Sequence, residues 1–224
     1  MNLVIVTSVI DTIQKPLSYT NTRSVFTIEE RFKQTIKTIE SIKKYINNPY
    51  IVLIEGSHIN NDYEYIFKNI VDYYFNISDI KIYKDNIDSP YKICGEASLL
   101  LSYLDSEHLK NNILNFKSIT KISGRYYLTE ECINIDEYLK YSNILCKYYK
   151  EHNNMSTIIY SFSINELNDY YISIKYIYNN LEKYKNESIE NILYDIWLKN
   201  KNYNNIEKLG VCGNIAVNNY FISV

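Results

Sequence analysis

The sequence predicts an α/β fold in which helices flank a mostly parallel central sheet, followed by a mixed α+β C-terminal half. Two observations carry this prediction. The apolar runs at residues 3–6 and 50–54 are typical of strands that are buried on both faces of a parallel sheet. A segment with helical periodicity lies between them, and the order strand, helix, strand is the unit from which parallel sheets are built.

Length and composition indicate a folded protein with a sizeable core. The chain has 224 residues, of which 46% are hydrophobic, and no linker rich in glycine or serine divides it, so we expect a single domain over residues 1–224. The formal net charge of -2 provides no basic excess for binding nucleic acid. The heavy use of Tyr, Ile, Asn and Lys resembles proteins from A/T-rich genomes.

Cysteine spacing and hydropathy indicate in which cellular compartment the protein is expected. Four cysteines lie far apart and form no C-x-x-C pair, which favours free thiols over a zinc site or a disulfide framework. The N-terminal apolar run is too short to span a membrane and lacks a basic region before it. We therefore expect a cytoplasmic protein without a membrane span.

The first elements follow from local signals. The first strand ends at Thr7 and Ser8, and residues 11–24 form a polar loop. Thr27 and Glu30 match the S/T-x-x-E capping box that begins a helix. Apolar residues then recur at helical spacing: Phe32, Ile36, Ile39, Ile42 and Ile46. We predict a helix here that ends before Pro49.

The middle of the chain alternates short strands and helices. The second strand, residues 50–54, runs into Glu55-Gly56-Ser57. After it we predict a helix at 61–70, short strands at 71–75 and 80–83, a polar loop at 84–90, a helix at 98–104 opened by Gly95-Glu96-Ala97, and a strand at 118–122.

The second half has a different texture. We predict paired strands at 143–148 and 157–162 around a polar turn at 150–154, then helices at 166–181 and 188–198. A hairpin turn at Asn218-Asn219 is expected before the final strand, and the glycine-dense segment 210–213 predicts a tight turn. Apolar residues within 170–178 belong either to the core or to a homodimer interface.

The order of these motifs resembles the GT-A fold glycosyltransferases, whose central sheet is Rossmann-like. The resemblance covers about residues 1–130 and rests on Val4-Ile5-Val6-Thr7-Ser8-Val9, Thr38-Ile39-Glu40-Ser41-Ile42, Val52-Leu53-Ile54-Glu55-Gly56-Ser57, Gly95-Glu96-Ala97 and Lys121-Ile122-Ser123-Gly124-Arg125-Tyr126. It implies that residues 1–130 bind a nucleotide-diphosphate sugar and that residues 131–224 shape the acceptor side.

The resemblance also implies roles for single residues. Glu55 occupies the position of the family's acidic residue that binds the base or ribose. Arg31 is expected either to contact phosphate or to pair with a nearby carboxylate. The full set implied for donor binding is Thr7, Ser8, Arg31, Glu55, Gly95, Lys121, Gly124 and Arg125.

One departure from the family pattern is informative. Where the family has a metal-binding D-x-D motif, this chain has Ser123-Gly124-Arg125, with Lys121 just before it. Mn²⁺ or Mg²⁺ prefers carboxylate oxygens, and this segment has none. We favour the interpretation that Lys121 and Arg125 replace the metal, with Gly124 allowing close approach of the backbone. In the alternative, a metal is held by carboxylates elsewhere: Asp85 and Asp88, or Asp105 and Glu107.

An inverting transferase of this family also needs a carboxylate base for the acceptor hydroxyl. The segment that begins the helix at 188–198 contains Glu190, our first candidate, and Glu187, our second. Acidic residues at this position also complement a helix dipole, so a structural role is the alternative.

The expected function is transfer of a sugar from a nucleotide-diphosphate sugar to a hydroxyl of a glycan acceptor. A sugar nucleotidyltransferase is one alternative, although such enzymes have a glycine-rich loop after the first strand and residues 11–22 contain no glycine. Because D-x-D is missing, a degenerate fold that acts as a sugar-binding or structural module is the other.

Overall fold

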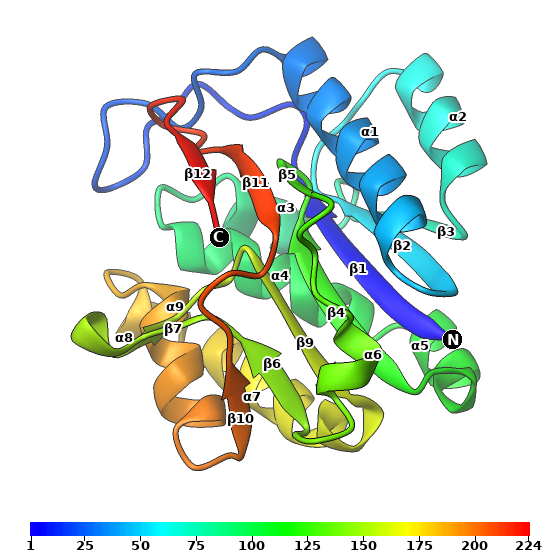
Figure 1. Cartoon of the computed structure of the whole chain (residues 1–224). Helices are drawn as coiled ribbons and strands as arrows, with labels where there is room; N and C mark the ends of the chain where they lie inside the picture. The colour runs from blue at the N-terminus through cyan, green and yellow to red at the C-terminus, as the bar shows by residue number, and fades with distance from the viewer.

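The computed structural model describes residues 1–224. Its centre is a seven-stranded sheet in the order β10-β6-β9-β4-β1-β2-β3. The strands are β1 (Asn2–Ser8), β2 (Pro49–Glu55), β3 (Tyr73–Asn76), β4 (Ser118–Ser123), β6 (Ile144–Cys146), β9 (Ile159–Ser163) and β10 (Tyr203–Asn205). β1 pairs in parallel with β2 and β4, and only β9 runs antiparallel to its neighbours (Figure 1). The predicted α/β fold with a mostly parallel sheet is confirmed.

Helices cover both faces of this sheet. α1 (Ile28–Tyr45) and α2 (Asn61–Ile70) pack on one face, and α4 (Lys92–Leu104), α7 (Leu167–Asn179) and α9 (Ile189–Leu193) pack on the other (Figure 1). Alternate residues of β1 serve the two cores: Val4 packs in the α1 layer, and Leu3 packs in the α4 layer. Short helices also form at α3 (Lys81–Ile87), α5 (Glu107–Asn112), α6 (Ile135–Tyr138) and α8 (Leu181–Tyr184).

Helix α1 begins as its sequence predicts. Thr27 Oγ1 accepts a hydrogen bond from Glu30 N at 3.2 Å, and Glu30 Oε2 accepts one from Thr27 N at 2.8 Å, so both bonds of the capping box form. Ile39 and Ile42 are fully buried against the sheet. The helix at 61–70 forms as predicted, and the strand predicted at 71–75 is β3, which begins two residues later.

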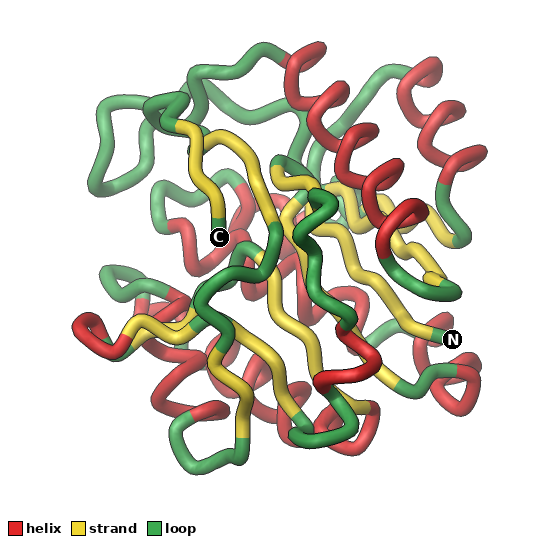
Figure 2. Tube along the Cα trace, viewed as in Figure 1, coloured by secondary structure: helices red, strands yellow, loops and turns green.

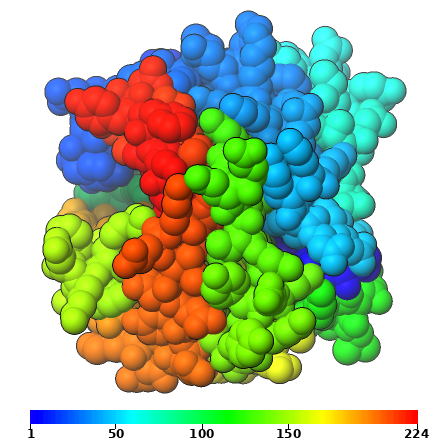
Figure 3. All heavy atoms as spheres, viewed as in Figure 1, coloured from blue at the N-terminus to red at the C-terminus, as the bar shows by residue number.

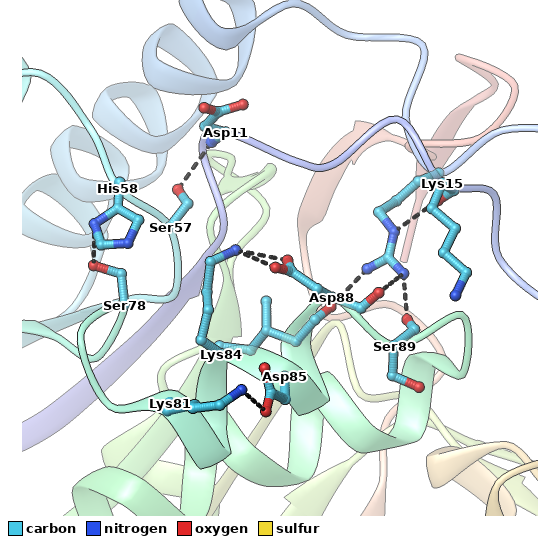
Figure 4. Close-up of polar contacts among 12 residues, drawn as sticks. Asp11, Lys15, Ser57, His58, Ser78, Lys81, Lys84, Asp85, Asp88 and Ser89 are labelled. Carbon is cyan, nitrogen blue, oxygen red and sulfur yellow. Dashed lines mark hydrogen bonds and ion pairs between the residues drawn. The ribbon is translucent and has the colours of Figure 1, made fainter.

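The segment between β3 and α4 differs from the prediction. Residues 80–83 were expected to form a strand and residues 84–90 a loop, whereas Lys81–Ile87 form helix α3. Ion pairs at i,i+4 spacing stabilise it: Lys81 to Asp85 at 2.7 Å and Lys84 to Asp88 at 2.6 Å (Figure 4). Helix α4 likewise begins at Lys92 rather than at residue 98, so Gly95 and Glu96 lie inside it.

The paired strands and the helices predicted for the second half form, but residues 211–214, where a tight turn was expected, form a strand. β6 and β9 pair antiparallel, α7 forms, and the helix after residue 188 consists of α9 followed by one π-helical turn, Tyr194–Leu198. β7 (Tyr148–Tyr149) and β8 (Asn154–Met155) flank the polar turn. Within α7, Tyr170, Ile174 and Ile177 belong to the core, while Ile172 and Tyr176 are exposed.

A small antiparallel sheet completes the fold. It contains β5 (Tyr126–Leu128), β11 (Val211–Asn214) and β12 (Phe221–Ser223), with a turn at Asn219, whose φ is 58°. This hairpin lies beside the long loop after β1, and Val25 N donates to Ala216 O at 2.8 Å (Figures 2 and 3). The chain contains no helix whose length and apolar character would allow it to cross a membrane.

Candidate functional site

A cavity of about 390 Å³ opens at the carboxyl ends of β1 and β4. Ligands of open α/β sheets bind at this edge. Thr7 and Ser8 end β1 in its wall, Ser123 ends β4, and Arg125 follows it. The remaining walls come from the loop after β1, the first turns of α4, the start of α9 and the β11–β12 hairpin; among their residues are Tyr19, Arg23, Lys92, Gly95, Glu96, Glu190 and Ala216.

Lys121 lies behind the cavity wall instead of lining it. Its side chain is 1% exposed, and its ammonium donates to Glu96 Oε1 at 2.8 Å, Ser123 Oγ at 3.0 Å and Thr157 O at 2.5 Å. These acceptors use all the N–H donors that a lysine has. The expectation that Lys121 contacts the donor directly is therefore corrected: it anchors Glu96, which does line the cavity.

Arg125 is the one cation of the cavity wall without a hydrogen-bond or ion-pair partner. Its Nε is buried without an acceptor, and its guanidinium carbon lies 5.5 Å from the centre of the Tyr126 ring. A buried donor without a partner is costly. A guanidinium in this state is suited to bind an anion from outside the protein.

Arg31 lies in the same wall but is already held by the protein. Its Nε donates to Val9 O at 2.7 Å and its Nη1 to Ser24 Oγ at 3.1 Å. It pairs with no carboxylate, so one of the two alternatives for it does not occur. Burial, and then the like charge of Arg125, lower the pKa of Arg31 to about 9. The wall holds four cations (Arg23, Arg31, Lys92 and Arg125) and two carboxylates (Glu96 and Glu190), which leaves a positive excess.

Glu190 is placed in the cavity by the start of α9. Ser188 caps this helix by accepting from Asn191 N at 3.1 Å. Glu190 Oε1 accepts from Lys92 Nζ at 2.7 Å and from Thr157 Oγ1 at 2.8 Å. Burial, the largest single effect, would raise its pKa, but the charge of Lys92 and the hydrogen bonds to the carboxylate together lower the pKa of Glu190 below its ordinary value. Glu187, in contrast, is exposed and does not line the cavity.

Glu55 is fully buried and lies outside the cavity lining. Its Oε1 accepts from Ile10 N at 3.0 Å, Ser57 N at 2.9 Å and Ser57 Oγ at 2.5 Å. Burial raises the pKa of this carboxyl group. The expected contact of Glu55 with a nucleotide is therefore corrected: the side chain shapes the turn after β1.

The two glycines of the predicted site have different surroundings. A Cβ at Gly124 would lie 3.1 Å from Thr35 Oγ1 and 3.3 Å from Thr7 O, so this glycine allows α1 to pack against the ends of β1 and β4. Gly124 does not line the cavity, which corrects the expectation that it admits a ligand. Gly95 does line the cavity, and a Cβ there would lie 3.3 Å from Ile87 Cα.

The alternative carboxylates for a divalent cation are engaged elsewhere. Asp85 and Asp88 are paired with Lys81 and Lys84 (Figure 4), Glu107 pairs with Lys110 at 2.9 Å, and Asp105 accepts from Tyr171 Oη at 2.7 Å. No group of three or more histidine, cysteine or acidic side chains in the chain is arranged to hold a metal ion. Each carboxylate of the cavity is bound by a lysine, so these residues do not fit Mn²⁺ or Mg²⁺.

Sequence reasoning missed three contributors to the site. Lys92 and Glu96 are charged residues at i,i+4 spacing in the first turns of an otherwise apolar helix, and that pattern was the available signal. Arg23 fastens the loop after β1 to the end of α3. Its guanidinium donates to Ile87 O at 2.6 Å, to Asp88 O at 3.2 Å and to Ser89 O, and its Nε donates to Lys15 O at 3.1 Å.

The mostly parallel seven-stranded sheet with helices on both faces is a GT-A-like α/β fold, and solved structures have similar folds. The CTP:phosphocholine cytidylyltransferase from Streptococcus pneumoniae is similar with a TM-score of 0.55 and 12% identity, over 98% of this chain and 96% of that one. A nucleoside-diphosphate-sugar pyrophosphorylase from Vibrio cholerae is similar with a TM-score of 0.52 and 12% identity, over 93% of this chain and 94% of that one.

The mannosyltransferase Ktr4p from S. cerevisiae is similar with a TM-score of 0.50 and 9% identity, over 88% of this chain. This chain spans 65% of the length of that mannosyltransferase. No protein-family model matches the sequence, and no curated protein matches it either. At these identities the similarity establishes the fold.

Proposed function

We propose that this protein transfers a sugar from a nucleotide-diphosphate sugar to a hydroxyl of a glycan acceptor. The observation that carries the proposal is the unpartnered guanidinium of Arg125 in the cavity wall. It follows the strand after which the GT-A family keeps its metal-binding motif. A guanidinium there can bind the diphosphate with two parallel hydrogen bonds and stabilise the charge that develops on it as the sugar leaves.

The charge of the cavity supports a metal-independent donor site. Each phosphate of a nucleotide sugar carries a negative charge, and the wall has two more cations than carboxylates. The positive excess therefore matches a diphosphate without a divalent cation. Thr7, Ser8 and Gly95 in the same wall offer hydroxyl and backbone groups to the donor.

Glu190 is the proposed base. Its lowered pKa keeps it ionised at neutral pH, and its Oε2 has no protein partner. In the proposed step Oε2 takes the proton of the acceptor hydroxyl while the acceptor oxygen bonds to the anomeric carbon. The bond from that carbon to the phosphate oxygen breaks, and its electron pair stays on the diphosphate. The acceptor would enter between α9 and the β11–β12 hairpin, in the half formed by residues 131–224.

Thermal-shift measurements with UDP-, GDP- and TDP-sugars, each with and without Mn²⁺, test the donor site. We expect at least one donor to raise the melting temperature without metal, and Arg125→Ala to abolish that rise. Lys37→Ala, which removes a cation whose Nζ lies 3.4 Å from the Tyr127 ring centre, is the control and should leave it unchanged. If no nucleotide or nucleotide sugar stabilises the protein, the proposal fails. Stabilisation that strictly requires Mn²⁺ overturns its metal-independent form.

A nucleotidyltransferase is the second candidate. This chain covers 96% and 94% of the two nucleotidyltransferase structures but 65% of the mannosyltransferase. The absence of glycine from residues 11–22 disfavours this candidate. Release of pyrophosphate from CTP with phosphocholine, or from a nucleoside triphosphate with a sugar 1-phosphate, would select it over sugar transfer. Binding of nucleotide sugars without turnover of any kind would instead indicate a binding module.

A further inference from the structure

Lys92 connects the two parts of the proposed site. It is the first residue of α4, its side chain is 43% exposed, and its Nζ lies 2.7 Å from Glu190 Oε1. Lys92 also lines the cavity together with Arg125. The N-cap residue of α4, Tyr91, makes no side-chain capping bond and also lines the cavity, so the positive end of this helix lies at the cavity wall.

The two carboxylate oxygens of Glu190 differ in their hydrogen bonds. Oε1 accepts from both Lys92 and Thr157, at 2.7 Å and 2.8 Å, whereas Oε2 accepts from no protein group. The bond from Thr157 would hold the carboxylate in place if Lys92 left. Lysine has a flexible stem and a compact charge, so its ammonium can change partners without movement of the backbone.

Other charged groups around Glu190 limit where Lys92 can go. Glu96 of α4 is held by Lys121 of β4 at 2.8 Å, which makes it a weaker competitor for Lys92. Arg125 lies after β4, and Tyr19 reaches the cavity from the loop after β1. Glu190 and Glu96 raise the pKa of Lys92 against the effect of burial, so Lys92 is charged at neutral pH. The positive charge of Lys92 is therefore available to an anion that enters beside Arg125.

We propose that Lys92 exchanges partners: its ammonium binds Glu190, as the structure shows, and moves to the diphosphate when the donor binds. This inference rests on the proposed function. A diphosphate offers several charged oxygens beside Arg125, so it competes well with one carboxylate oxygen. After the exchange Glu190 keeps its bond from Thr157 and loses its nearest positive charge, which makes it a stronger base for the acceptor hydroxyl when the donor is in place.

A double-mutant cycle on the binding of inorganic pyrophosphate, measured by calorimetry on the full chain, tests this exchange. We expect K92M to weaken binding about tenfold, and E190Q to tighten it because Lys92 no longer has to leave a carboxylate. In the K92M background E190Q should have a much smaller effect, which gives a coupling of about tenfold. K92R, which keeps the charge, should retain most of the affinity. Lys110→Met, which breaks a comparable pair with Glu107 at 2.9 Å outside this cavity, should change nothing.

Each outcome separates the two proposals. Equal effects of E190Q in both backgrounds, with binding still abolished by Arg125→Ala, would overturn the partner exchange and leave the donor site standing. Unchanged affinity in K92M would do the same. Absence of pyrophosphate binding, or binding that ignores Arg125, would overturn the donor site and the exchange together.

Discussion

Lys121 and Glu96 form the least exposed ion pair of the chain: Lys121 Nζ lies 2.8 Å from Glu96 Oε1, and the two side chains are 1% and 13% exposed. The lysine belongs to the central strand β4, and the glutamate belongs to the helix packed on it. The pair therefore joins the sheet to the first turns of α4, from which Lys92 and Glu96 reach the cavity. Burial lowers the pKa of Lys121, although Glu96 opposes that effect.

Glu96→Gln should destabilise the protein by about 3–5 kcal/mol at pH 7, because it leaves the Lys121 ammonium buried without its counter-charge. Removal of Glu96 should lower the pKa of Lys121 further, while the unfolded chain keeps a lysine pKa of about 10.4. Between these two pKa values the unfolded chain binds more protons, so the free energy of unfolding rises with pH in that window. Urea unfolding of Glu96→Gln between pH 7 and pH 10 should show a steeper rise than the wild type.

The double variant Glu96→Gln/Lys121→Met is the control for this prediction. It has no buried ammonium, so its stability should not show the added rise with pH, and it should exceed that of Glu96→Gln at pH 7. A parallel pH dependence in the single and double variants would show that Lys121 is not the titrating group.

A helix or strand could be predicted where the interactions that stabilise it are local in the sequence. α1 carries both its capping box and its apolar stripe in its own sequence, so it could be predicted. The segment at residues 80–87 has the alternating start Ile80-Lys81-Ile82-Tyr83, which suggests a strand. The sequence also holds the i,i+4 pairs of Lys81 with Asp85 and of Lys84 with Asp88, which favour a helix. The helix depends in addition on tertiary contacts: Ile87 lies against Gly56 and Gly95, where a Cβ would come within 2.8 Å and 3.3 Å of it. The sequence contains no local record of such packing.

The site shows the same division. Six of the candidate residues line one cavity: Thr7, Ser8, Arg31, Gly95, Arg125 and Glu190. The sequence could not place Lys121, because the position of a strand residue does not reveal that its ammonium has a partner 25 residues earlier in the chain. The role of Glu55 could not be predicted for a similar reason. The backbone N–H of Ile10 donates to its carboxylate, and the turn that brings Ile10 there depends on the pairing of β1 with β2.

Gly124→Ala should destabilise the protein by about 1–3 kcal/mol without weakening pyrophosphate binding. The new methyl group would be forced against Thr35 Oγ1 and the carbonyl oxygen of Thr7, at 3.1 Å and 3.3 Å, and neither Gly124 nor Thr35 lines the cavity. Urea unfolding measures the loss of stability and calorimetry the affinity. Adding Thr35→Ala to Gly124→Ala should cost less than the sum of the single effects, since it removes one of the two contacts. A large loss of affinity at unchanged stability would restore Gly124 to the ligand site.

Glu55→Gln should change how the free energy of unfolding depends on pH, and it should have little effect on the free energy of unfolding at low pH. Because burial raises the pKa of Glu55, the folded protein holds this proton more tightly than the unfolded chain does. The stabilisation is therefore complete below the unfolded pKa, about 4.3, and is lost as pH rises through the higher folded value. Glutamine keeps the acceptor for Ile10 N and Ser57 N but cannot ionise. Urea unfolding from pH 4 to pH 8 should show a smaller loss of unfolding free energy in the variant than in the wild type. If the unfolding free energy depends on pH identically in both proteins, Glu55 is not the titrating group.

Arg125→Met should weaken pyrophosphate binding without lowering the stability of the protein measured in the absence of ligand. Arg125 has a buried Nε without an acceptor and lies near the positive charge of Arg31. Methionine, which keeps an apolar stem beside Tyr126, should therefore leave the melting temperature measured without ligand unchanged or raise it. Pyrophosphate at a hundred times its Kd should stabilise the wild type by about 2.7 kcal/mol, and the variant at the same concentration by much less. Arg125→Lys, which keeps the charge but not the paired donors, should lie between the two. A variant that loses stability without ligand and still gains the full increment from pyrophosphate would mean that Arg125 is a packing residue, and the anion would then have to bind through Lys92 and the first turn of α4.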